Sequence, residues 1–146
     1  MSAPTERVAA EPGAPADLDW LCRDFATGTP GVRQVLVVAA DGLRLATSDG
    51  VDERLADQLC AATSGLVSLA RGTAALLGAE PVHQTIVETA GGYLFVTSIS
   101  QGSVLAVFTT RSADMGLVGY EMTMLAARVG HALTPGTRDG RTGPAR

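Results

Sequence analysis

The fold of this protein is decided by the stretch DERLADQLCAATSGLVSLARGTAALL, residues 52–77. Two mostly apolar stripes run along it at alternating spacings of four and three residues, the pattern of an α-helix with two apolar sides. We predict one long helix, capped by Asp52 and stopped by Gly78. The leucine-rich stripe is Leu55, Leu59, Ala62, Leu66, Leu69, Thr73 and Leu76, and the small-residue stripe is Ala56, Cys60, Thr63, Val67, Ala70, Ala74 and Leu77.

This helix lacks the charged, solvent-facing side that an ordinary surface helix has. No charged residue occurs between Asp57 and Arg71, so we expect cover on two sides. The chain's own core supplies one cover, and a second copy of the chain is the simplest source of the other. The alternative is a helix wholly buried within one domain, but a chain of 146 residues has little else to wrap it.

The two stripes compete for the contact with the second copy. An exposed leucine stripe would form an apolar patch of roughly 400–600 Å², at the upper limit for a soluble monomer. The small-residue stripe permits closer approach of two helices, so we favour it for the helix–helix contact. The pattern by itself leaves both assignments open.

Composition indicates one soluble, acidic domain. Hydrophobic residues make up 46% and aromatic residues 4%, so the core must be aliphatic. The net charge of −4 argues against a nucleic-acid surface and against docking onto anionic lipid. No uninterrupted apolar run is long enough for a membrane span, and no secretory signal is recognisable, so we expect no direct membrane insertion. Cys22 and Cys60 are typical of buried thiols in a reducing compartment, which predicts a cytoplasmic protein.

The rest of the chain supplies short elements on either side of the long helix. We expect a disordered arm over residues 1–16, a folded domain over 17–134 and a disordered tail over 135–146. A first helix starts at Asp17 and a last helix follows Asp114. Strands are predicted at 34–39, 43–48, 83–89, 93–99 and 103–109, joined mostly by short turns that contain glycine. The strand at 83–89 is polar enough to be an edge strand.

The predicted order is helix, two strands, helix, three strands, helix (αββαβββα). Short connections make the five-stranded sheet mainly antiparallel. The first strand, QVLVVA over residues 34–39, is apolar on both sides, so helices must cover both faces of the sheet. The fold class is therefore α/β, a three-layer α/β/α sandwich.

Motifs that would carry chemistry are missing from the sequence. A phosphate-binding loop needs a lysine and the chain has none, and no nucleophile-elbow motif occurs. His83 and His131 have no companion metal ligands, so we predict no metal, no cofactor and no catalytic residue. Arg111 is the arginine best placed to enter a partner's nucleotide site, although surface solvation is the simpler interpretation. We expect Trp20 and Tyr120 to pack in the core.

Several segments resemble the Roadblock/dynein light chain family. They are Asp19-Trp20-Leu21, Thr29-Pro30-Gly31-Val32, the run from Val37 to Leu43, and the small-residue run from Ala61 to Leu66. The segment from Gly116 to Met122 is similar to the actinobacterial branch, in which such proteins accompany a small Ras-like GTPase and a sensor-kinase-like membrane protein. The resemblance implies a homodimer in which the long helices pack together and the third strands pair edge to edge.

These considerations identify two sets of candidate residues and three candidate functions. The leading function is a non-enzymatic homodimeric scaffold that binds a Ras-like GTPase in a bacterial signalling complex. The alternatives are a GTPase-activating protein for that GTPase and a small-molecule-sensing domain. The predicted dimer-interface residues are Ala56, Leu59, Cys60, Thr63, Val67, Ala70, Ala74, Thr85 and Val87. The predicted partner-binding residues are Asp57, Ser64, Ser68, Arg71 and Arg111.

Overall fold

A computed structural model describes residues 15–134 of the chain. The helices are α2 (Pro15–Gly28), α3 (Glu53–Leu77) and α4 (Met115–Ala132), with a short 3-10 turn η1 (Ser100–Gly102). The strands are β1 (Val32–Val38), β2 (Arg44–Thr47), β3 (Gln84–Thr89), β4 (Gly92–Ser98) and β5 (Val104–Thr110). The predicted arm and tail lie outside the described residues, except that α2 starts at Pro15 and not at Asp17. Proline suits this first helical position because it has no N–H to leave unpaired.

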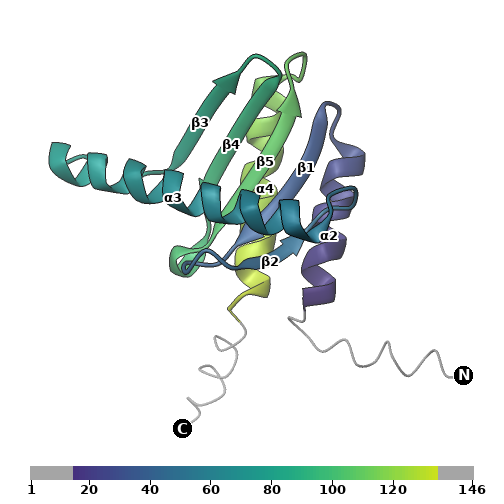
Figure 1. Ribbon diagram of the computed structural model, residues 1–146, viewed down its shortest axis with the longest axis horizontal. Coiled ribbons are helices and arrows are strands. Elements are labelled where there is room, and N and C mark those ends of the chain that lie inside the picture. The colour runs from purple at the N-terminus through teal and green to yellow at the C-terminus, as the bar shows by residue number, and fades with distance from the viewer. Residues whose placement is uncertain (1–14, 135–146) are drawn as a thin grey trace, which may run out of the picture.

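The five strands form one antiparallel sheet in the order β2-β1-β5-β4-β3. Helix α3 covers one face, and α2 and α4 cover the other (Figure 1). Side chains of β1 alternate between the two cores, as its apolar sequence requires: Val35 and Val37 pack under α2 and α4, and Leu36 and Val38 pack under α3. The three-layer α/β/α prediction is confirmed.

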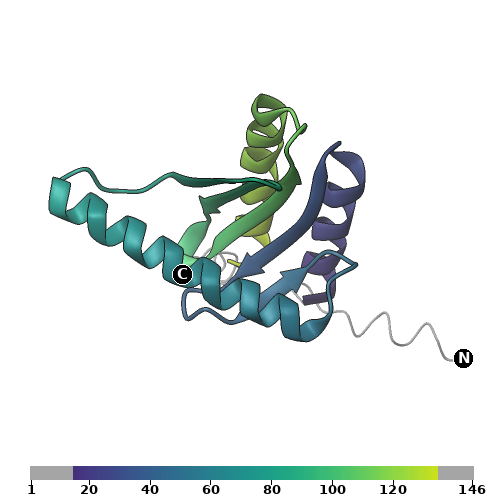
Figure 2. The ribbon, with the colours of Figure 1, turned by 45° about the horizontal axis from the view of Figure 1, so that its top comes forward.

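Local capping sets the ends of the long helix where the sequence placed them. The Asp52 carboxylate accepts the Leu55 N–H at 2.8 Å, and Gly78 closes the helix in the left-handed region at φ 66°. Helix α3 has 25 residues, a length of about 37 Å at 1.5 Å per residue. Its last buried residue is Val67, and the part of the helix beyond Val67 projects past β3 (Figure 2). We call the projecting residues 68–77 the overhang.

The small-residue stripe faces the sheet, not a partner. Ala56, Cys60, Thr63 and Val67 are buried in the single chain, against Leu36, Val38, Val96, Val104 and Ala106. Their predicted place at the helix–helix contact is therefore wrong. Small side chains do permit close approach, but here they bring the helix down onto a floor of branched strand residues.

The two rare aromatic residues predicted for the core are also exposed. Trp20 on α2 has 52% of its surface exposed and Tyr120 on α4 has 63%. Helix α4 begins where predicted: the Asp114 carboxylate caps it by accepting the Leu117 N–H at 3.0 Å. Its inward residues Val118, Met122, Leu125 and Val129 are buried.

The two edges of the sheet differ. At the β2 edge, the Asp19 carboxylate accepts the Thr47 N–H at 3.1 Å, and Arg44 is tied to Asp57 of α3 at 3.1 Å. Strand β3 is the other edge, as predicted, and within residues 15–134 no strand pairs with its outer side. The β2 edge is thus blocked by side chains from two helices, and the β3 edge is available for pairing.

The β3–β4 hairpin allows a direct test of this packing. A Cβ on Gly92 would collide with the carbonyl oxygen of Thr109 on β5, whereas a Cβ on Gly91 meets no atom within 4 Å. We expect Gly92→Ala to lower the free energy of unfolding by about 1–3 kcal/mol, as overpacking does. The matched variant Gly91→Ala should leave it nearly unchanged. Urea denaturation measures both, and equal stability of the two variants would contradict the hairpin geometry.

Candidate protein-interaction surface

The outer side of α3 is an exposed apolar surface. The leucines of the overhang are the most open, at 73% for Leu69, 89% for Leu76 and 74% for Leu77. Helix propensity and the two caps fix this segment as helix, but no strand of residues 15–134 lies beneath it. The overhang therefore presents an apolar surface that the described part of the chain leaves uncovered, a feature that marks interaction sites.

An apolar groove runs beside the first half of α3, at the end of the sheet where the β3–β4 hairpin turns. Its volume is about 440 Å³. Leu55 and Leu59 of α3 form one wall, and Val87, Leu94 and Phe108 of the sheet form the floor. We call it the α3 groove. The overhang and the α3 groove are both on the α3 side of the sheet. The overhang lies past β3, and the groove lies at the β3–β4 hairpin end, between α3 and strands β1, β5, β4 and β3.

The remaining predicted interface residues lie at or near these features. Leu59 is half-buried and lines the α3 groove, and Ala70 and Ala74 are half-buried on the overhang. Thr85 and Val87 are half-buried on β3, with cross-strand partners Val96 and Leu94 in the core under α3.

The predicted interface omitted the three exposed leucines of the overhang, Leu69 and Leu76 of the leucine-rich stripe and Leu77 of the small-residue stripe. The clue in the sequence was side-chain volume. Small residues fit the narrow space between a helix and a sheet, and large ones remain on the side where a partner can fill more room.

The structure brings together four of the five predicted partner-binding residues. Asp57, Ser64, Ser68 and Arg71 follow one another along α3. Ser68 and Arg71 are exposed, whereas Ser64 is half-buried close to Gly42 of the β1–β2 turn. Asp57 is exposed but paired with Arg44.

Arg111 lies elsewhere, at the β3–β4 hairpin. Its guanidinium donates to the Thr89 carbonyl at 3.0 Å and is 3.7 Å from the Glu88 carboxylate. An arginine that enters a partner's nucleotide site must be free to move. Arg111 would have to leave both contacts first.

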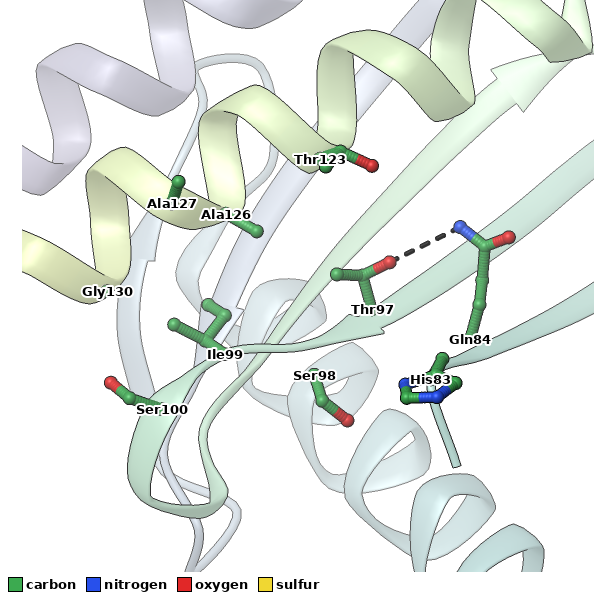
Figure 3. Close-up of a pocket in the computed structure, with 10 residues that line it drawn as sticks. All are labelled: His83, Gln84, Thr97, Ser98, Ile99, Ser100, Thr123, Ala126, Ala127 and Gly130. Atoms are coloured by element: carbon green, nitrogen blue, oxygen red, sulfur yellow. Dashed lines mark hydrogen bonds between the residues drawn. The ribbon is translucent and has the colours of Figure 1, made fainter. Parts of the chain in front are cut away.

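A second hollow of about 550 Å³ lies on the opposite face, between α4 and the ends of β3 and β4 (Figure 3). The Gln84 side-chain amide donates a hydrogen bond to the Thr97 hydroxyl at 3.3 Å within this hollow. Thr123 and Ala126 of α4 line its other side (Figure 3). Its polar side chains are serines, threonines, Gln84 and His83 at an open surface. An enclosed apolar cavity with convergent polar groups would favour a small-molecule site, and this hollow has a different form.

Comparison with known proteins agrees with this architecture. Residues 18–109 match the Roadblock/LC7 domain family. The chain belongs to this family. A Roadblock/LC7 domain from Streptomyces avermitilis is 35% identical, with a TM-score of 0.76 over 80% of this chain and 97% of that one. A comparison with curated proteins finds no significant match.

More distant structures share the fold. Myxococcus xanthus MglB is 19% identical, with a TM-score of 0.74 over 80% of this chain and 87% of that chain. The gliding protein MglB of Thermus thermophilus is 17% identical, with a TM-score of 0.72 over 82% of this chain and 91% of that chain.

Helix α3 of this Roadblock/LC7 protein is, by length and composition alone, apolar enough to cross a membrane. Its inner side nevertheless packs on the sheet through Ala56, Cys60, Thr63 and Val67. The helix is thus one layer of the sandwich, and its outer side is the part that needs a cover.

Neither thiol of the Roadblock/LC7 chain is poised for chemistry. Burial raises the pKa of Cys22 to about 12 and that of Cys60 to about 11. Both side chains are unpaired and packed in the two cores. Within residues 15–134, no group of three His, Cys, Asp or Glu side chains is arranged to hold a metal ion.

These pKa values predict inert thiols. At about pH 8 a maleimide should label neither cysteine of the folded chain while it labels both in urea, because only the thiolate reacts. The neutral thiols also make stability depend on pH. The stabilisation is complete below the ordinary thiol pKa of 9.0 and is lost as pH rises toward 11 to 12, because the unfolded chain ionises first. Rapid labelling of the native chain would contradict the packing of α2 and α3.

Proposed function

We propose that this Roadblock/LC7 chain is a homodimeric, non-enzymatic scaffold that binds a small Ras-like GTPase in a bacterial signalling complex. One observation carries the proposal: within residues 15–134, the exposed leucines of the overhang and the α3 groove are both left open on the α3 side of the sheet, and the overhang projects past the β3 edge. A two-fold rotation about that edge places the overhang of each copy over the groove of the other. Such an isologous contact closes on itself and leaves neither surface open.

Only one edge of the sheet is available for pairing, which favours a closed dimer over a longer polymer. Asp19 blocks the β2 edge, so only β3 is available for backbone pairing. The Ser98 N–H donates to the His83 carbonyl at 3.5 Å. Because hydrogen bonding alternates along an antiparallel strand, Gln84, Ile86 and Glu88 direct their backbone N–H and C=O groups outward.

The register of the pair follows from these outward groups. Centring the two-fold axis on Ile86 uses all three outward residues of each β3 and sets Gln84 opposite Glu88 of the second copy. A register centred on Glu88 would place two carboxylates face to face, which is unfavourable. In the favoured register, Thr85 lies opposite Val87 of the second copy.

The outer side of the paired helices is the proposed GTPase surface. Ser68 and Arg71 are exposed on α3, with Arg71 beside residues 80–83, and no charged residue occurs between Asp57 and Arg71. Family membership supports a GTPase as the partner class. An MglB structure with a tetrameric arrangement, 17% identical, shows that a protein of this fold can self-associate. A sensor-kinase-like membrane protein is the second partner that we propose, so a cytoplasmic pair would reach the membrane through it.

The scaffold role is better supported than the two alternatives. An activator that acts through Arg111 would have to break that residue's contacts with Thr89 and Glu88. A sensor domain would need an enclosed cavity, and the hollow beside α4 is open. A scaffold needs only the apolar surfaces already described.

A disulfide tests the proposed pairing and its register. In Thr85→Cys/Val87→Cys, each new thiol should face one from the second copy at a Cα separation of about 4.5 Å, within disulfide range. We expect mild oxidation to convert most of the chain to a covalent dimer on a non-reducing gel. The single variants Thr85→Cys and Val87→Cys should cross-link far less. Equal cross-linking by all three variants would overturn the register.

The scaffold role is tested by separating the pair. Light scattering should give twice 14.9 kDa for the native chain and 14.9 kDa for Leu76→Glu, because the variant places a charge in the buried contact. Purified small GTPases of the source organism, loaded with GDP or a GTP analogue, are then titrated with both proteins.

We expect one GTPase to bind the native pair, and its affinity for Leu76→Glu to fall more than about tenfold, equivalent to 1.4 kcal/mol. The exposed Leu43→Glu on the β1–β2 turn controls for the added charge. A native chain that is monomeric, or that binds no GTPase, would overturn the proposal.

A further inference from the structure

We propose that pairing creates a second docking site, a slot on the face of the sheet opposite α3 that accepts one α-helix of another protein. The inference rests on the proposed homodimer and is separate from the GTPase surface, because the sheet lies between the two sites. Its occupant is an amphipathic helix with an uncharged contact face, and one such helix binds per two chains.

The slot begins as an uncovered strip of sheet. On this face α2 lies behind β1, and α4 lies behind β4 and β5, but among residues 15–134 no helix lies behind β3 (Figure 1). The β3 side chains here are Gln84, Ile86 and Glu88. Ile86 pairs across the sheet with the buried Phe95, yet 48% of its own surface is exposed. An apolar side chain in the middle of a strand is left without a covering layer.

The width of the strip decides what fits. Neighbouring strands lie about 4.8 Å apart, and a helix with its side chains is about 10–12 Å across. One uncovered β3 is therefore too narrow for a helix in a single chain. Pairing at the β3 edge places two such strips side by side, about 10 Å in total, which matches one helix. The slot exists only in the pair, with Ile86 of both copies at its centre.

The side of the slot formed by α4 allows another helix to pack close to it. Tyr120, Thr123, Ala127 and Gly130 follow one another on α4 at helical spacing, and the last three line the hollow beside the strip (Figure 3). Small side chains allow a second helix to approach closely. Tyr120, with 63% of its surface exposed, offers a large, rigid anchor of the kind that dominates binding energy.

The charge pattern selects the occupant. His83 is the only titratable residue in the lining of the hollow, and Glu88 at the strip already has Arg111 at 3.7 Å. A helix that seats here must therefore be uncharged where it touches the slot, because a buried unpaired charge is costly.

The chain's own ends are more charged than the slot favours, and a further copy of the chain does not fit. Residues 1–14 carry Glu6, Arg7 and Glu11, and residues 135–146 carry three arginines and an aspartate. A closed pair has no free β3 edge for a third copy. The occupant is accordingly a segment of a different protein.

A selected peptide provides the probe. Helices of about 18 residues with uncharged apolar faces, long enough at 1.5 Å per residue to cross the slot, are displayed and selected against the full-length native chain. The tightest binder is then titrated by calorimetry. We expect saturation at one peptide per two chains.

Tyr120→Ser should weaken the peptide's affinity at least about tenfold, in the range of a binding hot spot. The dimer should remain intact in that variant, because Tyr120 lies on α4, away from the β3 edge and α3. Trp20→Ser is the matched control: its aromatic side chain is similarly exposed at 52%, but on α2, and its loss should leave the affinity unchanged.

The outcomes distinguish this inference from the proposed function. Light scattering and GTPase titration are run on the same preparation. A dimer that binds a GTPase but yields no peptide, or that binds one peptide per chain, overturns the slot alone. Equal affinity of native chain and Tyr120→Ser also overturns it. A monomeric native chain overturns the homodimer and the slot together.

Discussion

A mismatch of lengths underlies the structure: the long helix is longer than the sheet beneath it is wide. Helix α3 has 25 residues and runs about 37 Å, whereas five strands at a spacing of about 4.8 Å make a sheet about 24 Å wide. The helix crosses the strands obliquely from β2 and β1 towards β3 (Figure 1). Its last turns therefore extend beyond the sheet and carry exposed leucines, and the open β3 edge lies beside them.

Features that depend on neighbours in the chain could be predicted from the sequence. Asp52, Gly78 and Asp114 act as caps through bonds within one turn, so both helices begin, and α3 ends, where these residues occur. The apolar run in β1 could be filled only by cover on both faces, which predicts the sandwich. The polar alternation of β3 marked it as an edge. Each of these inferences needed only a few adjacent residues.

Features that depend on distant parts of the chain could not be predicted in the same way. The stripes of α3 are both apolar, and the choice between them follows from the floor that the helix meets. Leu36, Val38 and Ala106 come from two strands, and only their assembly shows that Cys60 fits there and Leu69 does not. Trp20 and Tyr120 were assigned to the core because aromatic residues are few. They are exposed because no further helix within residues 15–134 covers the outer sides of α2 and α4.

An uncharged interaction surface also constrains how a partner is recognised. Charges accelerate encounter and reject wrong partners through repulsion, and the outer side of α3 offers none between Asp57 and Arg71. Discrimination must then come from shape, which requires a rigid surface. A single helix that overhangs its sheet would be a poor template, because no strand of residues 15–134 lies beneath its last turns. In the proposed homodimer, packing each overhang on the other copy's sheet would supply that support, so the pairing that hides the leucines would also make the surface rigid enough to be specific.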